Sequence, residues 1–252
     1  MPLTFLAHQA PLLPVARRWP RHVDGVALLV GTMAPDYAYV LDGTRWHVWA
    51  HALPALATFC IPATLVVAWC VVRVLAPIVP DHLPEGGAFR WRDYRALARH
   101  RIGLAAPVSA FAGSVSHVVL DEFNHAWGWP AQHWPAYTAV LFDGEVLGRS
   151  FTVYRCVGFA EHVLLSVLCL VLLWRYGRER WLATEAAEVP AFVPSARTHA
   201  ALWGCTLAAV VLVAIVMPWQ VRHSSALILR LAAGAFGGLV AGALLARRLA
   251  PR

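Results

Sequence analysis

Five runs of about twenty apolar residues constrain the fold of this chain more than any other feature. They cover roughly residues 53–76, 102–121, 152–174, 200–219 and 225–246. Each run has close to the ~20 residues with which an α-helix crosses a hydrocarbon layer of ~30 Å. Only 14% of the residues are charged, whereas about 25% are charged in an average soluble domain. The sequence therefore predicts an all-α fold: a polytopic helical bundle in a membrane, with about five transmembrane helices.

A shorter apolar segment lies ahead of these runs, between Asp24 and Pro35. Aspartate is a preferred N-cap, so a short helix is expected to begin there. With about ten residues before the proline, this helix is too short to span a bilayer. We expect it to be buried against other helices or to lie at the interface. We treat residues 1–252 as a single membrane-embedded domain: 1–50 form short helices and half of a site, 51–175 a core, and 176–252 two C-terminal transmembrane helices.

The arginines alternate between loops in a pattern that predicts an orientation. Five lie in loop 77–101, four in loop 175–199 and three in the C-terminal tail, whereas the alternate loops contain only Arg149 and Arg222. By the positive-inside rule, the arginine-rich loops and the C-terminus are cytoplasmic, and residues 122–151 and the N-terminal region face outward. Arginines at positions 17, 18, 21 and 45 argue for the opposite orientation. Because the arginines form no single stripe, nucleic acid is a poor explanation for the net charge of +7.

The end of the second apolar run contains three potential metal ligands, His117, Asp121 and His125. Their i, i+4, i+8 spacing places them on one face of a helix. Two imidazoles and a carboxylate next to hydrocarbon are costly without partners. Taken alone, this stripe is compatible with a metal site and with ordinary hydrogen-bonded residues at a helix end.

The predicted topology brings further ligands to the same side of the membrane. The first helix starts, and the second ends, on one membrane face, so His51 lies on the side of His117, Asp121 and His125. His8 and Asp36 precede the first crossing and belong to that side as well. Histidine and carboxylate ligands suit one or two divalent ions, zinc above all, with manganese, iron and magnesium as alternatives. Nearby carboxylates would accept or deliver protons.

Other ionisable residues are secondary candidates. Glu122 adjoins Asp121 but points about 100° away around the helix. Glu161 and His162 lie inside the third apolar run, where ionisable groups are functional candidates by default. A Glu161 ion pair with Arg155 on the same helix is the competing structural interpretation, and Arg230 would neutralise Glu161 or contact an anionic headgroup or phosphate. In the last run, Gly234, Gly238 and Gly242 form a small-residue stripe that favours close packing within the chain over dimerisation.

At several of these residues the chain resembles a bacterial membrane-protein family known as domain of unknown function 4184. The matching text is Met1-Pro-Leu-Thr-Phe-Leu-Ala-His8-Gln, Gly31-Thr-Met-Ala-Pro-Asp36, His51-Ala-Leu-Pro and Ser116-His117-x-x-x-Asp121-x-Phe-x-His125. The same order of motifs is similar to membrane-bound metal-dependent hydrolases and zinc-dependent phospholipase C. This resemblance implies an integral protein of the bacterial cytoplasmic membrane. It also implies a metal centre of His8, Asp36, His51, His117 and Asp121, with His125 as a further ligand or proton-transfer group. The third helix, with Glu161 and His162, departs from the expected Gln- or Ser-rich pattern.

Three functions remain open on the sequence. The first is a metal-dependent, phospholipase C-like hydrolase that cleaves a phosphoester of a lipid or lipid-like substrate with a metal-activated water, while Asp36, Asp121 and His125 transfer protons and Arg45 or Arg230 stabilises charge. The second is a lyase or cyclase that acts on an isoprenoid diphosphate. The third is a transporter or scaffold with a structural zinc site. In the first two, the partner is a membrane lipid or a lipid-linked phosphate or diphosphate.

Overall fold

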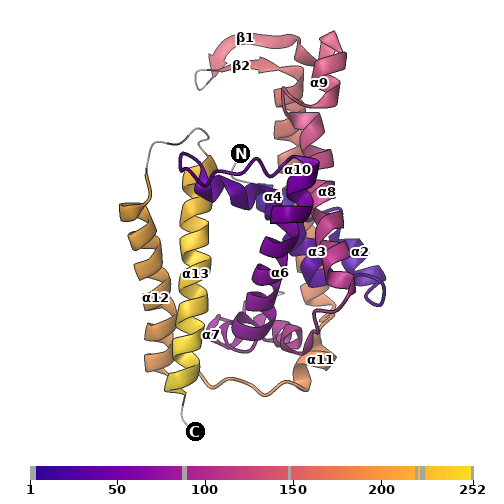
Figure 1. The fold of residues 1–252 in the computed structure, drawn as a ribbon. Coiled ribbons are helices and arrows are strands. Elements are labelled where there is room, and N and C mark those ends of the chain that lie inside the picture. Colours follow the sequence, from indigo (N-terminus) through magenta and orange to yellow (C-terminus); the bar gives the residue numbers. More distant parts are fainter. Residues whose placement is uncertain (1–3, 87–89, 147–148, 219–220, 222–224, 251–252) are drawn as a thin grey trace.

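The computed structural model describes residues 4–86, 90–146, 149–218, 221 and 225–250. Met1 to Leu3 of the first motif, and Arg222 and Arg252 of the arginine pattern, lie outside these residues. Helices dominate the structure, and Figure 1 shows the long ones running between two opposite ends of the molecule. The predicted all-α, polytopic architecture is confirmed.

Four helical segments in the described residues are long and apolar enough to cross a membrane, which identifies an integral membrane protein. They are Leu53–Leu75, α10 (Val153–Arg178), α12 (Ala196–Val216) and α13 (Ser225–Leu249). The first of these segments is continuous but has four parts: helix α5 (Leu53–Ala55), π-helical η2 (Leu56–Cys60), helix α6 (Ile61–Cys70) and π-helical η3 (Val71–Leu75). They correspond to the first, third, fourth and fifth apolar runs.

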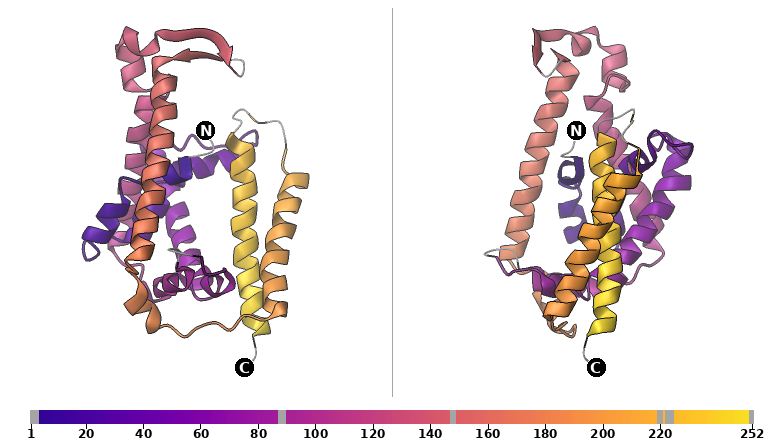
Figure 2. Two further views of the ribbon diagram at one scale, coloured as in Figure 1. Left: turned by 180° about the vertical axis from the view of Figure 1, so that it is seen from behind. Right: turned by 90° about the vertical axis from the view of Figure 1, so that its left-hand side faces the viewer.

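The second run forms α8 (Ala105–Asn124), which is not among these four segments. Its 20 residues equal a spanning helix in length, because a rise of 1.5 Å per residue gives about 30 Å. Serines, His117 and two acidic residues lower its apolar character. Figures 1 and 2 show α8 side by side with α10, and it also contacts α6.

The N-terminal region forms short helices, as expected. They are α1 (Thr4–Ala7), α2 (Leu13–Arg18), α3 (Gly25–Gly31), α4 (Ala34–Tyr37) and the 3-10 helix η1 (Ala38–Leu41). The predicted N-cap is confirmed, since the Asp24 carboxylate accepts a hydrogen bond from the Ala27 amide at 2.9 Å. α3 packs on α8 and α6, so it is buried against other helices.

The loops carry the remaining elements. They are α7 (Val79–His82), the 3-10 helix η4 (Trp91–Arg99), α9 (Trp129–His133), the 3-10 helix η5 (Pro135–Thr138), strands β1 (Val140–Val146) and β2 (Arg149–Thr152), and α11 (Ala183–Ala187). The antiparallel hairpin of β1 and β2 was not expected in the aromatic segment 122–151. Its β-branched and aromatic residues, such as Val140, Phe142 and Phe151, favour strands.

Glycines allow the closest helix contacts in the described structure. A Cβ on Gly238 would lie 2.6 Å from the Thr206 Cα, so the glycine stripe of α13 packs against α12 within the chain. A Cβ on Gly113 of α8 would lie 2.3 Å from the Leu28 carbonyl oxygen of α3. The second contact matters for the site, because the chain that leaves α3 carries Asp36 and must reach the ligand face of α8.

Candidate metal centre

The ligand face of α8 is buried at His117 and Asp121. The His117 Nδ1 atom lies 2.7 Å from the Thr32 carbonyl oxygen, directly after α3. A carbonyl only accepts, so Nδ1 carries the proton and donates it. The Nε2 atom is then left with a lone pair that faces the interior, which is the arrangement typical of a metal-binding histidine.

His51 joins these two residues from the segment just before α5. The three atoms His51 Nε2, His117 Nε2 and Asp121 Oδ2 form a triangle whose edges all measure 3.3 Å. Two ligand atoms that each lie ~2.0–2.1 Å from a tetrahedral zinc ion are roughly 3.3 Å apart. The triangle therefore has the dimensions of three ligands around one ion.

Asp36 approaches the same point from α4. Its Oδ1 atom lies 3.6 Å from His117 Nε2 and 3.8 Å from His51 Nε2. Met33, Ala34 and Pro35 lead directly from the chain after α3 into this short helix, so the contact of α3 with α8 also positions the Asp36 carboxylate. Asp36, His51 and His117 can each offer one ligand atom, all within 4.8 Å of one another.

His8, which follows α1, completes a second group with His117 and Asp121. Its Nε2 atom lies 3.7 Å from Asp121 Oδ1, and its ring stacks on that of His117 with centroids 4.0 Å apart. Both ring nitrogens of His8 and the Oδ1 atom of Asp121 are buried without a hydrogen-bond partner in the described structure. Desolvation, reinforced by His117, lowers the pKa of His8 to about 2, so its imidazole is neutral and able to bind a metal ion.

We call His8, Asp36, His51, His117 and Asp121 the His/Asp cluster. All five are buried, and in the described structure no arginine pairs with either carboxylate. Asp121 presents Oδ2 to His51 and His117 and Oδ1 to His8. One ion in the triangle, or two ions bridged by this carboxylate, would each satisfy the buried atoms. The donor set therefore fits a divalent ion.

The remaining predicted ligand, His125, lies at the edge of the cluster. It is the C-cap of α8, its side chain is 42% exposed, and its Nδ1 donates to the Asp121 carbonyl at 3.1 Å. Its ring stacks on Trp127 at 5.1 Å. Trp49 and Trp127 also contact the His51 ring, at 5.4 and 6.2 Å. The exposed side of the cluster is thus lined by aromatic rings and one accessible histidine.

The secondary candidates have other partners. The Glu122 carboxylate accepts from the Trp129 amide at 2.6 Å and so holds the start of α9. Glu161 accepts from Asn124 Nδ2 at 3.1 Å, and its Oε1 atom is buried without a partner among the described residues. His162 Nδ1 donates to the Gly158 carbonyl at 2.6 Å, and the ring lies edge-on to His8 with centroids 5.8 Å apart.

The two arginines proposed to stabilise charge lie among different groups. Arg45 is exposed, with its guanidinium 4.8 Å from the centre of the Trp46 ring. Arg230 is fully buried in α13, where it donates to the carbonyls of Val40, Asp42 and Pro218. Its guanidinium therefore binds the end of η1, the residue after it and the segment after α12, whereas Glu161 pairs with Asn124.

Sequence reasoning did not single out the residues that orient the ligands. These are the Thr32 carbonyl, the glycines Gly31 and Gly113 at the contact of α3 with α8, and the rings of Trp49 and Trp127. The positions of the two glycines in the sequence could have indicated their role. Gly31 opens the motif that ends in Asp36, and Gly113 lies one helical turn before His117. Both would clash with the facing backbone if they carried a Cβ.

Residues 1–247 match the family described as Domain of unknown function (DUF4184). The match extends from the N-terminal helices to the last turn of α13 and includes every residue of the His/Asp cluster. No curated protein and no solved structure matches the chain.

Proposed function

Since the chain belongs to the DUF4184 family, a domain family of unknown function, we propose its function from the His/Asp cluster. We propose a membrane-embedded, metal-dependent hydrolase that cleaves a phosphoester of a lipid or lipid-linked substrate. Zinc is the ion that the nitrogen-rich triangle suits best. The observation that carries the proposal is the triangle of His51, His117 and Asp121, with 3.3 Å edges and no arginine partner in the part of the chain that the structure describes.

The residues of the cluster have separate tasks in this proposal. His51, His117 and Asp121 would hold the ion, Asp36 would accept a proton beside it, and the Thr32 carbonyl keeps the His117 ring in the tautomer that binds it. A divalent ion with an open position acidifies water and polarises a phosphoryl oxygen. His125, exposed beside Asp121, delivers or removes a proton on the solvent side.

The surroundings of the cluster support a lipid-like substrate. Trp49 and Trp127 cover His51 on the side where His125 is exposed, and they limit the access of water. Trp129 and Trp134, in and just after α9, expose about half of their surfaces nearby in the chain. Tryptophan prefers the boundary between hydrocarbon and headgroups. An entrance with this lining admits an amphiphile whose phosphate is presented at that boundary.

A structural metal site is the second candidate, and the burial of the cluster favours it. The five side chains are almost inaccessible, and the Asp36 carboxylate supplies a fourth ligand beside the triangle. A site closed by four protein ligands has no open position and stabilises the fold without chemistry.

The experiment begins with the metal content of the protein purified in a mild detergent. The protein is then assayed with two kinds of substrate. Phosphatidylcholine and phosphatidylglycerol are followed by diacylglycerol release, and a polyprenyl diphosphate is followed by diphosphate release, the product of cleavage at its phosphoester bond. We expect one product to form, to vanish after chelation, and to return when zinc is added.

Matched variants distinguish the two candidates. His51→Gln removes a ligand, whereas His133→Gln changes a histidine whose Nδ1 bonds to the Trp129 carbonyl outside the cluster. Loss of product and of metal in the first variant alone supports the hydrolase. A bound ion that resists chelation while no substrate is cleaved supports the structural site. A protein without bound ion that gains none on zinc addition contradicts both.

A further inference from the structure

A cavity of about 610 Å³ lies at the opposite end of α6 from the His/Asp cluster. Its lining residues come from α6, η3, the turn after η3, η4, the segment before α12 and α13, and include Trp69, Arg73, Val74, Ile78, Leu244 and Arg247. The segment Leu53–Leu75 separates the two sites; its 23 residues correspond to about 35 Å of helix. The cavity therefore belongs to the other membrane face.

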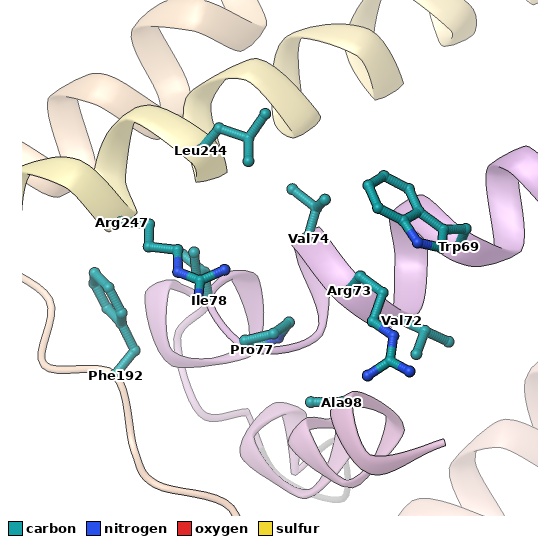
Figure 3. Close-up of a pocket in the computed structure, with 10 residues that line it drawn as sticks. All are labelled: Trp69, Val72, Arg73, Val74, Pro77, Ile78, Ala98, Phe192, Leu244 and Arg247. Carbon is teal, nitrogen blue, oxygen red and sulfur yellow. The ribbon is translucent and has the colours of Figure 1, made fainter. Parts of the chain in front are cut away.

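The residues that line the cavity change from apolar to basic along the membrane normal. Trp69 precedes Arg73 by one helical turn, and Leu244 precedes Arg247 by about one turn. On both walls the apolar residue lies nearer the middle of the spanning segment, and the arginine lies two residues before its end. Figure 3 shows the Arg73 guanidinium next to Ala98 and the Arg247 guanidinium next to Ile78, with Leu244 and Trp69 farther from Ala98. The cavity is thus apolar on the bilayer side and cationic at the interface.

The charges in this region leave these two arginines without a partner. The acidic groups nearby in the chain pair with other arginines: Asp81 with Arg95 at 3.4 Å, Glu85 with Arg92 at 3.6 Å, Asp93 with Arg180 at 2.8 Å, and Glu188 with Arg99. Neither Arg73 nor Arg247 has an ion pair or hydrogen bond with any described residue. Two cations on opposite walls of one cavity therefore lack a counter-ion among the described residues.

We propose that this cavity binds an anionic glycerophospholipid, with the lipid phosphate between Arg73 and Arg247 and an acyl chain along Trp69, Val74 and Leu244. The cavity volume falls in the range of about 300–1,000 Å³ that ligand sites occupy. The arginine-rich loops 77–101 and 175–199 flank it, and the positive-inside rule predicts that this face is cytoplasmic. Anionic lipids are the headgroups that basic residues attract at that surface. The site is independent of the metal centre and of its chemistry.

Binding is measured on the detergent-solubilised full-length protein by native mass spectrometry. The protein is titrated with phosphatidylglycerol and, separately, with phosphatidylcholine of the same acyl chains. We expect phosphatidylglycerol to bind more tightly. Arg73→Gln and Arg247→Gln should each weaken its binding about fivefold, since one basic residue at a membrane surface contributes about that factor. The double variant should lose about 25-fold if the two effects add.

Arg248→Gln is the matched control, because Arg248 follows Arg247 in the last turn of α13 but does not line the cavity. A second variant, Leu244→Trp, narrows the apolar wall of the cavity and keeps both arginines. It should weaken phosphatidylglycerol binding and leave the affinity for inorganic phosphate unchanged. The melting temperature and metal content of each variant show that the fold is intact.

Three results would overturn the proposal. One is equal affinity for the two lipids, and another is a loss in Arg248→Gln as large as in Arg73→Gln. The third is binding of inorganic phosphate as tight as that of phosphatidylglycerol, which would leave the apolar wall without a role. Because the readout is lipid binding, these results are separate from any failure of the hydrolase proposal.

Discussion

Buried aspartates lie at both ends of the molecule, but their carboxylates have different kinds of neighbours at each end. At the arginine-rich end, Asp81 and Asp93 are 7% and 8% exposed. Asp93 receives two hydrogen bonds from the Arg180 guanidinium, at 2.8 and 3.1 Å, and Asp81 lies 3.4 Å from Arg95. At the other end, Asp36 and Asp121 are 7% and 4% exposed, and their ion-pair partners among the described residues are histidines.

The difference indicates which group neutralises each carboxylate. A buried carboxylate is costly unless it is paired and hydrogen-bonded. Arginine supplies the positive charge for Asp81 and Asp93, whereas no arginine pairs with Asp36 or Asp121 among the described residues. The imidazoles beside Asp36 and Asp121 can supply lone pairs in place of charge. A divalent cation bound as proposed above would neutralise the carboxylates of Asp36 and Asp121.

The largest expected effect is on metal binding, and it appears when an aspartate from each end is replaced by asparagine in separate variants. Asp121→Asn should weaken zinc binding by more than about 100-fold, because changes to residues that merely support ligands already cost 10–100-fold. Asp93→Asn should leave zinc binding unchanged. Metal content after dialysis against a graded zinc buffer measures both. Equal zinc retention in the two variants would remove the distinction between the ends.

The second-largest expected effect is also on zinc affinity, and it appears when one buried histidine from each end is replaced by alanine. His8→Ala should weaken zinc binding by about 10–100-fold while the triangle of His51, His117 and Asp121 still holds an ion. His82 is also buried, but its nitrogens bond to the Ile78 carbonyl and the Thr198 hydroxyl. His82→Ala should lower the melting temperature and leave zinc affinity unchanged. Zinc titration with a competing chelator checks the affinities, and an unaltered His8→Ala variant would exclude His8 from the site.

Gly113→Ala tests whether the approach of α3 to α8 positions the ligands. The added methyl group would meet the Leu28 carbonyl oxygen at 2.3 Å, so the two helices must separate. We expect a loss of about 1–3 kcal/mol in stability and about tenfold in zinc affinity, as overpacking and ligand displacement imply. In α12, a Cβ on Gly204 would meet nothing within 4 Å, so Gly204→Ala should raise stability slightly. Thermal unfolding in detergent gives the sign, and a neutral Gly113→Ala would contradict the tight contact.

The smallest expected effect is on the pH dependence of stability. It involves Asp24, which lies close to His100 outside the His/Asp cluster. Burial alone would raise the pKa of Asp24, but the bond with His100 and the Ala27 amide outweigh it, so the pKa is lowered. A depressed carboxyl pKa contributes stability above the unfolded value of about 3.9, which is lost as the pH falls through the folded value. The wild type should therefore lose more stability between pH 5 and pH 3 than Asp24→Asn, which keeps an N-cap. Parallel losses in thermal unfolding would contradict this assignment.

The sequence predicts those features that depend on the hydrocarbon layer and on local capping. Spanning segments follow from apolar length, and the α3 start follows from Asp24, because both are local properties. Topology predicts which face carries His8, Asp36, His51 and His117, since each crossing reverses the side. It does not give the rotation of each helix, so the stacking of His8 on His117 requires the structure. The Thr32 carbonyl is not predictable from residue type, because every residue has one.

The hairpin of β1 and β2 and the partners of Arg230 were missed for a related reason. Strand pairing and carbonyl bonds join distant parts of the backbone, and neither leaves a periodic pattern in one segment. The buried arginine in the fifth run suggested an acidic or phosphate partner, whereas backbone carbonyls satisfy its donors.

Arg230 also has a consequence for the order in which the protein is completed during synthesis. Its guanidinium bonds to Val40, which leaves the ribosome 190 residues earlier. Until α13 has emerged and inserted, the carbonyls of Val40 and Asp42 lack this donor, and the loop that joins Asp36 to His51 is not secured. A chain truncated before α13 would contain every ligand of the cluster yet lack the last tether of that loop. The residues of the His/Asp cluster thus all lie in the first half of the chain, but the loop that carries two of them is held in place only once the last helix is present.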